Sequence, residues 1–165
     1  MISHRIAIHL LLVTLGLGAL ATCVPYAQAQ DTAPPTVHKS VFGAVGFAYG
    51  QTARVNVANI FGVEDPNELP GTSCEAVVSY DGPDTTPLVP STVLFVNPGE
   101  IRSVDLNRNS LAVGGPNRLT FRIVVTLIGN PNITPDPCSR MRLTTEIFDN
   151  LTGRTQVFIG DPNVK

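Results

Sequence analysis

The chain has 165 residues and a formal net charge of −2 at pH 7, with 11 Lys and Arg against 13 Asp and Glu. Affinity for the phosphates of nucleic acid requires clustered Lys and Arg, and the sequence contains no basic block, so we expect no nucleic-acid partner. The length is sufficient for one domain with a substantial hydrophobic core.

Residues 1–29 are predicted to be a secretory signal peptide. Arg5 precedes an almost wholly apolar run, Ile6–Leu20, and the small residues Ala27 and Ala29 occupy the two positions that a signal peptidase reads. Cleavage is expected between Ala29 and Gln30. The apolar run is shorter than the ~20 residues that span a bilayer, so we expect no transmembrane segment after removal. The mature protein is predicted to be exported to the periplasm or the extracellular space.

Cys23 leaves a second interpretation of this segment open. Leu20-Ala21-Thr22-Cys23 is similar to the box at which bacterial lipoproteins are cut and lipidated on cysteine. Such boxes usually have Gly, Ala or Ser before the cysteine, whereas this one has Thr22. The alternative is therefore a lipoprotein anchored through Cys23.

Residues 30–40 contain Pro34 and Pro35 and are predicted to be a mobile lead-in. Residues 41–165 are predicted to form a single domain. Its first stretch, Phe42–Arg54, is rich in Gly but lacks the Lys-Ser/Thr ending and the following helix of a phosphate-binding loop. We interpret it as an edge strand with bulges that leads into a strand at Ala53.

Strands are expected at several places where apolar residues alternate with polar ones and β-branched or aromatic residues are frequent. Thr92–Val96 is apolar on both faces and is predicted to be a central strand. The other predicted strands are Ala53–Ile60, Cys74–Tyr80, Glu100–Leu106, Leu119–Leu127, Met141–Phe148 and Arg154–Ile159. Gly- and Pro-rich turns separate them, and no stretch has sustained helical periodicity. This pattern predicts an all-β, immunoglobulin-like antiparallel β-sandwich of roughly 7–9 strands.

Two cysteines, Cys74 and Cys138, remain after removal of the signal peptide. In an exported protein such a pair indicates a disulfide, here between the strand that begins at Cys74 and the one predicted to begin at Cys138. The bond is expected to join the two sheets. A zinc site is disfavoured because His38 is the only histidine outside the signal peptide.

Asp149-Asn150-Leu151-Thr152-Gly153 lies between the last two predicted strands. A short loop ending in Gly is typical of a hairpin with a type I turn followed by a left-handed Gly, and Asp149 and Asn150 suit its first positions. The sequons Asn132-Ile133-Thr134 and Asn150-Leu151-Thr152 are relevant only in a host with matching glycosylation machinery.

No catalytic, metal or cofactor residues are predicted. A Ser-His-Asp or Cys-His arrangement has only His38 available, and no pair of acidic residues forms a recognisable constellation. The loop at Asp81-Gly82-Pro83-Asp84 has too few carboxylates for the six to eight oxygen ligands that Ca²⁺ takes.

Four stretches together resemble a family of small secreted bacterial proteins of the acidobacterial type: FGAVGFAYGQTAR at Phe42, the Cys-led strand at Cys74, NPGEIRSVDL at Asn97, and EIFDNLTGRT at Glu146. The last is the most specific, and the resemblance covers most of the mature chain. It implies an exported β-domain with a terminal hairpin, and it implies no activity, substrate or site residue.

The predicted function is a non-catalytic exported β-sandwich that binds an unknown protein or envelope component or supports an envelope structure. A carbohydrate-binding module is the alternative. It is disfavoured because sugar platforms need exposed aromatic rings, the sequence has no Trp, and of Tyr49 and Tyr80 the second is expected to face the core. An enzyme is the least favoured class.

Overall fold

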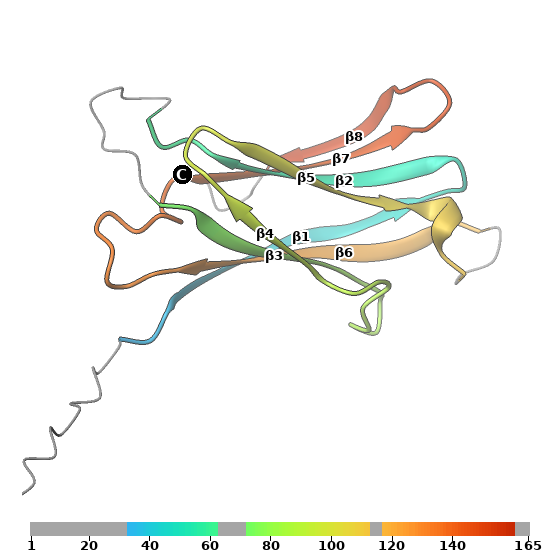
Figure 1. Ribbon diagram of the computed structural model, residues 1–165. Coiled ribbons are helices and arrows are strands. Elements are labelled where there is room, and N and C mark those ends of the chain that lie inside the picture. The colour runs from blue at the N-terminus through green and yellow to red at the C-terminus, as the bar shows by residue number, and fades with distance from the viewer. Residues whose placement is uncertain (1–32, 63–71, 113–116, 161–165) are drawn as a thin grey trace, which may run out of the picture. The chain divides into compact units, whose positions relative to one another are not determined.

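The computed structural model describes residues 33–62, 72–112 and 117–160 (Figure 1). The predicted signal peptide, its cleavage site at Ala29 and Gln30, and Cys23 lie outside the described residues, so they remain predictions. The folded unit that contains the described residues is built almost entirely of strands.

Eight strands and one short 3₁₀ helix follow one another along the chain. They are β1 (Thr36–Phe47), β2 (Gln51–Asn59), β3 (Cys74–Asp81), β4 (Thr92–Val96), β5 (Ile101–Asn107), η1 (Arg108–Ser110), β6 (Leu119–Gly129), β7 (Met141–Asp149) and β8 (Thr155–Gly160).

The strands form two four-stranded antiparallel sheets that lie in two layers (Figure 1). The first sheet has the order β1-β6-β3-β4, and the second has the order β5-β2-β7-β8. Apolar side chains of the two facing surfaces fill the space between them. The prediction of an all-β antiparallel sandwich with one disulfide is therefore confirmed.

The pairing of the strands makes the sandwich immunoglobulin-like in architecture. As in that fold, β2 pairs with β5 in one sheet while β3 pairs with β6 in the other. Two strands differ from that fold: β1 pairs with β6 and leaves the place beside β2 to β7, and β4 pairs with β3 instead of β5. The chain thus changes sheets at five of the seven connections between these strands, and only β3–β4 and β7–β8 stay within one sheet.

The core follows directly from the alternation in the sequence. In β3 the residues Cys74, Ala76, Val78 and Tyr80 are all buried, and the residues between them are half-buried on the outer surface. Phe121 of β6 lies at the centre, with its ring centroid 4.6 Å from that of Phe47 and 6.0 Å from that of Tyr80. Period-two patterning therefore places one face of each sheet inside.

Tyr80 joins the two sheets through a polar contact inside the sandwich. Its ring is buried, and its hydroxyl donates a 2.7 Å hydrogen bond to the backbone carbonyl of Val104 in β5. Burial of the phenol, and secondarily the negative charge of Asp105, raise the pKa of Tyr80.

Replacement of Tyr80 with Phe should remove part of the protein's sensitivity to alkali. Because the folded-state pKa is raised, folded Tyr80 keeps its proton above about pH 10, where the unfolded chain loses it. This contribution is present below the unfolded pKa and is lost as pH rises. Urea unfolding between pH 9 and 12 should show the wild type losing up to about 1.4 kcal/mol per pH unit more than Y80F. Parallel curves for the two proteins would contradict this.

The predicted boundary between the lead-in and the domain differs from the structure. The lead-in is predicted at residues 30–40, but β1 begins at Thr36, and Thr36–Lys39 pair with Thr126–Gly129 of β6. Val37, His38 and Lys39 are exposed on this edge strand, so the segment lacks clear apolar alternation. Phe42–Arg54 contains the expected edge strand, with a register shift between Phe42 and Val45.

The prediction that Thr92–Val96 is a central strand is wrong. The bounds of β4 are those predicted, but it lies at the edge of the first sheet and pairs with β3. Val93 and Phe95 are 51% and 59% exposed. A strand that is apolar on both faces is ordinarily buried on both, so these exposed side chains require a different explanation.

Candidate functional site

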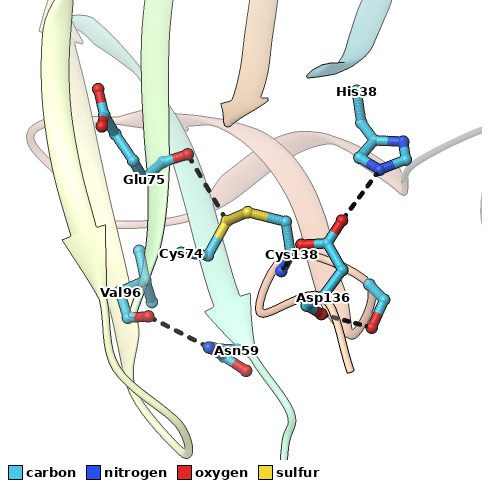
Figure 2. The surroundings of a disulfide bond; sticks show 8 residues. His38, Asn59, Cys74, Glu75, Val96, Asp136 and Cys138 are labelled. Atoms are coloured by element: carbon cyan, nitrogen blue, oxygen red, sulfur yellow. Dashed lines mark hydrogen bonds and ion pairs between the residues drawn. A yellow bond between two sulfur atoms is a disulfide. The ribbon is translucent and has the colours of Figure 1, made fainter. Parts of the chain in front are cut away.

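The disulfide ties the start of β3 to the connection between β6 and β7 (Figure 2). Cys74 and Cys138 are both buried, and their Cα atoms lie 5.0 Å apart. The expectation that Cys138 begins a strand is wrong, because it lies in the loop before Met141, where β7 starts. The bond therefore fastens the first sheet to the chain segment that enters the second sheet.

Asn59 forms side-chain hydrogen bonds beside the disulfide (Figure 2). It is buried at the end of β2, and its side-chain amide donates a 3.1 Å hydrogen bond to the carbonyl of Val96 in β4. Its side-chain oxygen accepts a hydrogen bond from the backbone N–H of Phe61. Sequence analysis missed this residue, although a polar residue at an inward position after Val55 and Val57 was a usable signal.

Asp136 organises the loop that carries Cys138. One carboxylate oxygen accepts a 2.9 Å hydrogen bond from the backbone N–H of Cys138, and the other lies 3.6 Å from Nε2 of His38 (Figure 2). Gly129 faces the same carboxylate, and a side chain at position 129 would collide with it. His38 is thus placed beside a structural carboxylate, and the sulfur of nearby Cys138 is held in the disulfide.

The predicted turn residues Asp149, Asn150 and Gly153 lie at the tip of the β7–β8 hairpin. Gly153 has a φ of +67°, and its N–H donates a 2.8 Å hydrogen bond to the carbonyl of Asp149. The Asp149 carboxylate accepts hydrogen bonds from the backbone N–H groups of Leu151 and Thr152 and from the Thr152 hydroxyl. The Thr152 backbone bond is the main cause that lowers the pKa of Asp149. These contacts are those of a turn.

Replacement of Gly153 with Val should destabilise the protein without affecting a binding surface elsewhere. A left-handed backbone costs an L-residue roughly 1–2 kcal/mol, and a β-branched side chain suffers most. Gly160→Val is the control, because its surroundings are open and its φ is not in the left-handed region. Thermal unfolding should show a lower Tm for G153V alone. An unchanged Tm in G153V would argue against the observed turn.

The outer surface of the first sheet carries an apolar cluster, which we call the apolar face. Strand register places its members in three neighbouring rows across the sheet. The first row is Val37, Ile128, Glu75 and Phe95; the second is Lys39, Thr126, Val77 and Val93; the third is Val41, Val124 and Ser79. Apolar side chains from all four strands therefore lie next to one another.

The apolar face is open to solvent at its margins and hollowed at one end. Val37 is 58% exposed and Val41 46%, on the side opposite Val93 and Phe95. Beside Phe95 and Glu75 a hollow of about 300 Å³ opens against three prolines, Pro35, Pro131 and Pro137. A hollow of this size is at the lower limit of small-molecule sites.

The outer surface of the second sheet has a different chemistry. At its centre the Arg54 guanidinium makes two 2.7 Å contacts with the Asp105 carboxylate and lies 5.0 Å from the centre of the Phe148 ring. Ser103 donates a 2.7 Å hydrogen bond to the side chain of Asn56 on the same surface. The polar groups here bind one another, so the two outer surfaces of the sandwich are not equivalent.

Within the described residues, no three His, Cys, Asp or Glu side chains are grouped so that they could hold a metal ion. Asp84 of the loop considered for Ca²⁺ instead accepts hydrogen bonds from the backbone and side chain of Thr86. No helix in the described part of the chain is long and apolar enough to span a bilayer.

No protein-family model matches the sequence, and no curated protein matches it. Among solved structures, the chain is similar to the crystal structure of Thermotoga maritima 1070, with 12% identity and a TM-score of 0.44 over 74% of this chain and 90% of that chain. It is also similar to the structure of infectious bursal disease virus Gx strain, with 7% identity and a TM-score of 0.21 over 75% and 40% of the two chains. Both similarities are too weak to indicate a function.

Proposed function

We propose that the protein is a non-catalytic, exported β-sandwich that binds a protein of the envelope or the extracellular space through its apolar face. The observation that carries the proposal is the exposure of Val37, Val41, Val93 and Phe95 on one outer sheet surface. An antiparallel sandwich normally presents polar residues there. Burying exposed apolar surface against a partner is favourable, at roughly 25 cal/mol per Å².

The size and charge of the apolar face fit a protein partner. Four strands spaced ~4.8 Å apart, over five residues at ~3.4 Å each, present roughly 300 Å² of projected area. Apolar patches of about this size are often functional, and a polar rim normally surrounds such a core in an interface. The face includes one cation, Lys39, and one carboxylate, Glu75. We therefore expect the partner to present an apolar surface with a carboxylate opposite Lys39 and a cation opposite Glu75.

A carbohydrate ligand is less well supported by the positions of the aromatic rings. Tyr49 is half exposed, but its ring lies against the guanidinium of Arg108, at 4.4 Å from the ring centre. Phe95 lies on the outer surface of the first sheet, and Phe158 belongs to the second sheet. A sugar platform needs exposed rings that share a surface, and these three rings lie on different parts of the sandwich. Phe148 shares the outer surface of the second sheet with Phe158, but it is half-buried and the Arg54 guanidinium lies 5.0 Å from its ring centre.

Site-directed photo-crosslinking tests the binding proposal. A photoreactive residue at position 95 should trap one reproducible protein in the native envelope or medium, whereas one at Ser103, on the polar outer surface, should not. The trapped protein is then purified, and its affinity for wild type, Phe95→Lys and Leu151→Lys is compared. F95K should weaken binding at least tenfold, and L151K, at the exposed hairpin tip, should not. Equal affinities for all three proteins would refute the apolar face as the binding surface.

Export is part of the proposal and is supported by the disulfide, since such bonds persist in oxidising compartments. The intact mass of the protein from its native host, before and after reduction and alkylation, tests it. A chain that starts at Gln30 and gains two thiols only on reduction would support a free exported domain. A chain that starts at Cys23 with acyl groups would identify a lipoprotein. An uncleaved chain with free thiols would refute export.

A further inference from the structure

The last strand, β8, is an edge strand whose outer edge differs from the three other edges of the sandwich. Sheet edges invite pairing with further chains, and proteins usually protect them with charges, prolines or very short strands. β1 carries Lys39 and a register shift between Phe42 and Val45, and β5 carries Arg102 and Asp105. β4 has only five residues, which lie between Pro90 and Pro98.

β8 lacks such charges and prolines within the strand itself, although Arg154 precedes it and Asp161 and Pro162 follow it in the sequence. Its sequence, TQVFIG, has neither a charge nor a proline, and it is rich in residues that favour strands. Among the described residues, β8 pairs with β7 alone. Its bulge lies at the hairpin end, where the register shifts between Ile147 and Phe148, so Val157–Gly160 is regular. Phe158 is 64% exposed and Val157 37% exposed.

We propose that β8 pairs in antiparallel orientation with β8 of a second copy of this chain, which joins the two second sheets into one eight-stranded sheet. A two-fold axis perpendicular to the sheet makes such a contact self-complementary and closed. Because β8 is uncharged, pairing it with itself brings no like charges together. The same operation about the middle of β5 would bring Asp105 near its own counterpart, and in β1 the register shift between Phe42 and Val45 interrupts a regular edge.

The side chains select one register for this pairing. With Phe158 opposite Phe158 of the second copy, Val157 comes opposite Ile159, so apolar residues meet on both surfaces of the joined sheet. Val157 and Ile159 belong to the inner surface, because they pair with the buried residues Ile147 and Thr145. A shift that places Val157 on the axis would instead set Phe158 opposite Gln156. The contact covers one short strand per copy, so the dimer is expected to dissociate on dilution.

Charge substitutions at Phe158 test the pairing. Sedimentation velocity of the oxidised protein should show the mass doubling between about 1 µM and 1 mM. Phe158→Lys and Phe158→Glu should each be monomeric, because each places two like charges opposite one another. An equimolar mixture of F158K and F158E should restore the dimer. Phe95→Lys is the matched control, since Phe95 is equally exposed on the other sheet, and it should dimerise like wild type.

Several results would overturn the proposal: a wild type that stays monomeric up to 1 mM, a mixture that stays monomeric, or assemblies that grow beyond the dimer. Circular dichroism confirms that each variant is folded. Hydrogen exchange of wild type is a check that needs no variant, because a peptide covering Val157–Ile159 should exchange more slowly at high protein concentration. Equal exchange at all concentrations would also overturn the pairing. Because F95K and F158K act on different surfaces, failure of this proposal and failure of the binding proposal are distinguishable.

Discussion

Removal of the disulfide by the double substitution Cys74→Ala and Cys138→Ala should lower the free energy of unfolding by about 4 kcal/mol. The two cysteines are 64 residues apart in the sequence, so the bond closes a long loop and removes many conformations from the unfolded chain. For a domain of this size the loss corresponds to a fall in Tm of roughly 10–20 °C. Urea unfolding measures the free energy and thermal unfolding measures the Tm, both followed by circular dichroism.

Two controls separate the covalent bond from the packing of the sulfur atoms. Wild type in the presence of a reductant should reproduce most of the loss, since the cysteine side chains remain in place. Leu151→Ala, at a residue that is 94% exposed at the hairpin tip, should change stability by less than about 0.5 kcal/mol. If the double variant unfolded at the same urea concentration as oxidised wild type, the bond would contribute nothing to stability.

Phe121→Ala should cost about 3–5 kcal/mol, because it removes the central ring of the core and leaves a cavity that its neighbours fill only in part. Phe121 is fully buried and contacts the rings of both Phe47 and Tyr80. The loss is expected as a lower urea midpoint with little change in the slope of the transition.

Phe95→Ala is the matched control for Phe121→Ala, because both residues belong to the first sheet and Phe95 lies on its outer surface. It should cost less than about 1 kcal/mol. Equal losses in the two variants would contradict the assignment of inner and outer surfaces. A small loss in F95A combined with weaker partner binding in F95K would show that the exposed phenylalanine is kept for binding.

The stability variants and the surface variants address different questions. The disulfide and Phe121 act on the packing between the sheets, whereas Phe95 and Phe158 lie outside it. A variant that lowers Tm and also weakens binding therefore says little about the binding surface. Binding and association should be measured well below the Tm of each variant, so that the folded population is the same throughout.

Much of the fold was predictable from local patterns. The strands β2, β3, β6 and β7 were predicted to within a few residues of their observed ends, because buried strands alternate strictly between apolar and polar positions. The Cys74–Cys138 disulfide followed from the count of cysteines in a chain expected to be exported. Residues Asp149–Gly153 were recognisable as a turn, because the preference of Asp, Asn and Gly for turns depends on local backbone geometry and not on distant contacts.

Strand order could not be predicted in the same way. Nothing in the alternation of Thr36–Phe47 indicates that this strand pairs with β6 and not with β2, because pairing depends on where the chain crosses between the sheets. Asn59 and Tyr80 likewise gained their cross-sheet partners, the carbonyls of Val96 and Val104, only through the packing of two layers.

The sequence by itself determined which side of each strand is apolar, which residues turn the chain and which cysteines are available to pair, since these depend on period-two geometry and local backbone chemistry. The tertiary structure alone decided which apolar side chains stay exposed. Val93 and Phe95 look like core residues in the sequence, and they are exposed because β4 lies at an edge with one outer surface uncovered. An apolar side chain is buried only where other elements pack over it. Which elements do so depends on contacts between residues that are distant in the sequence.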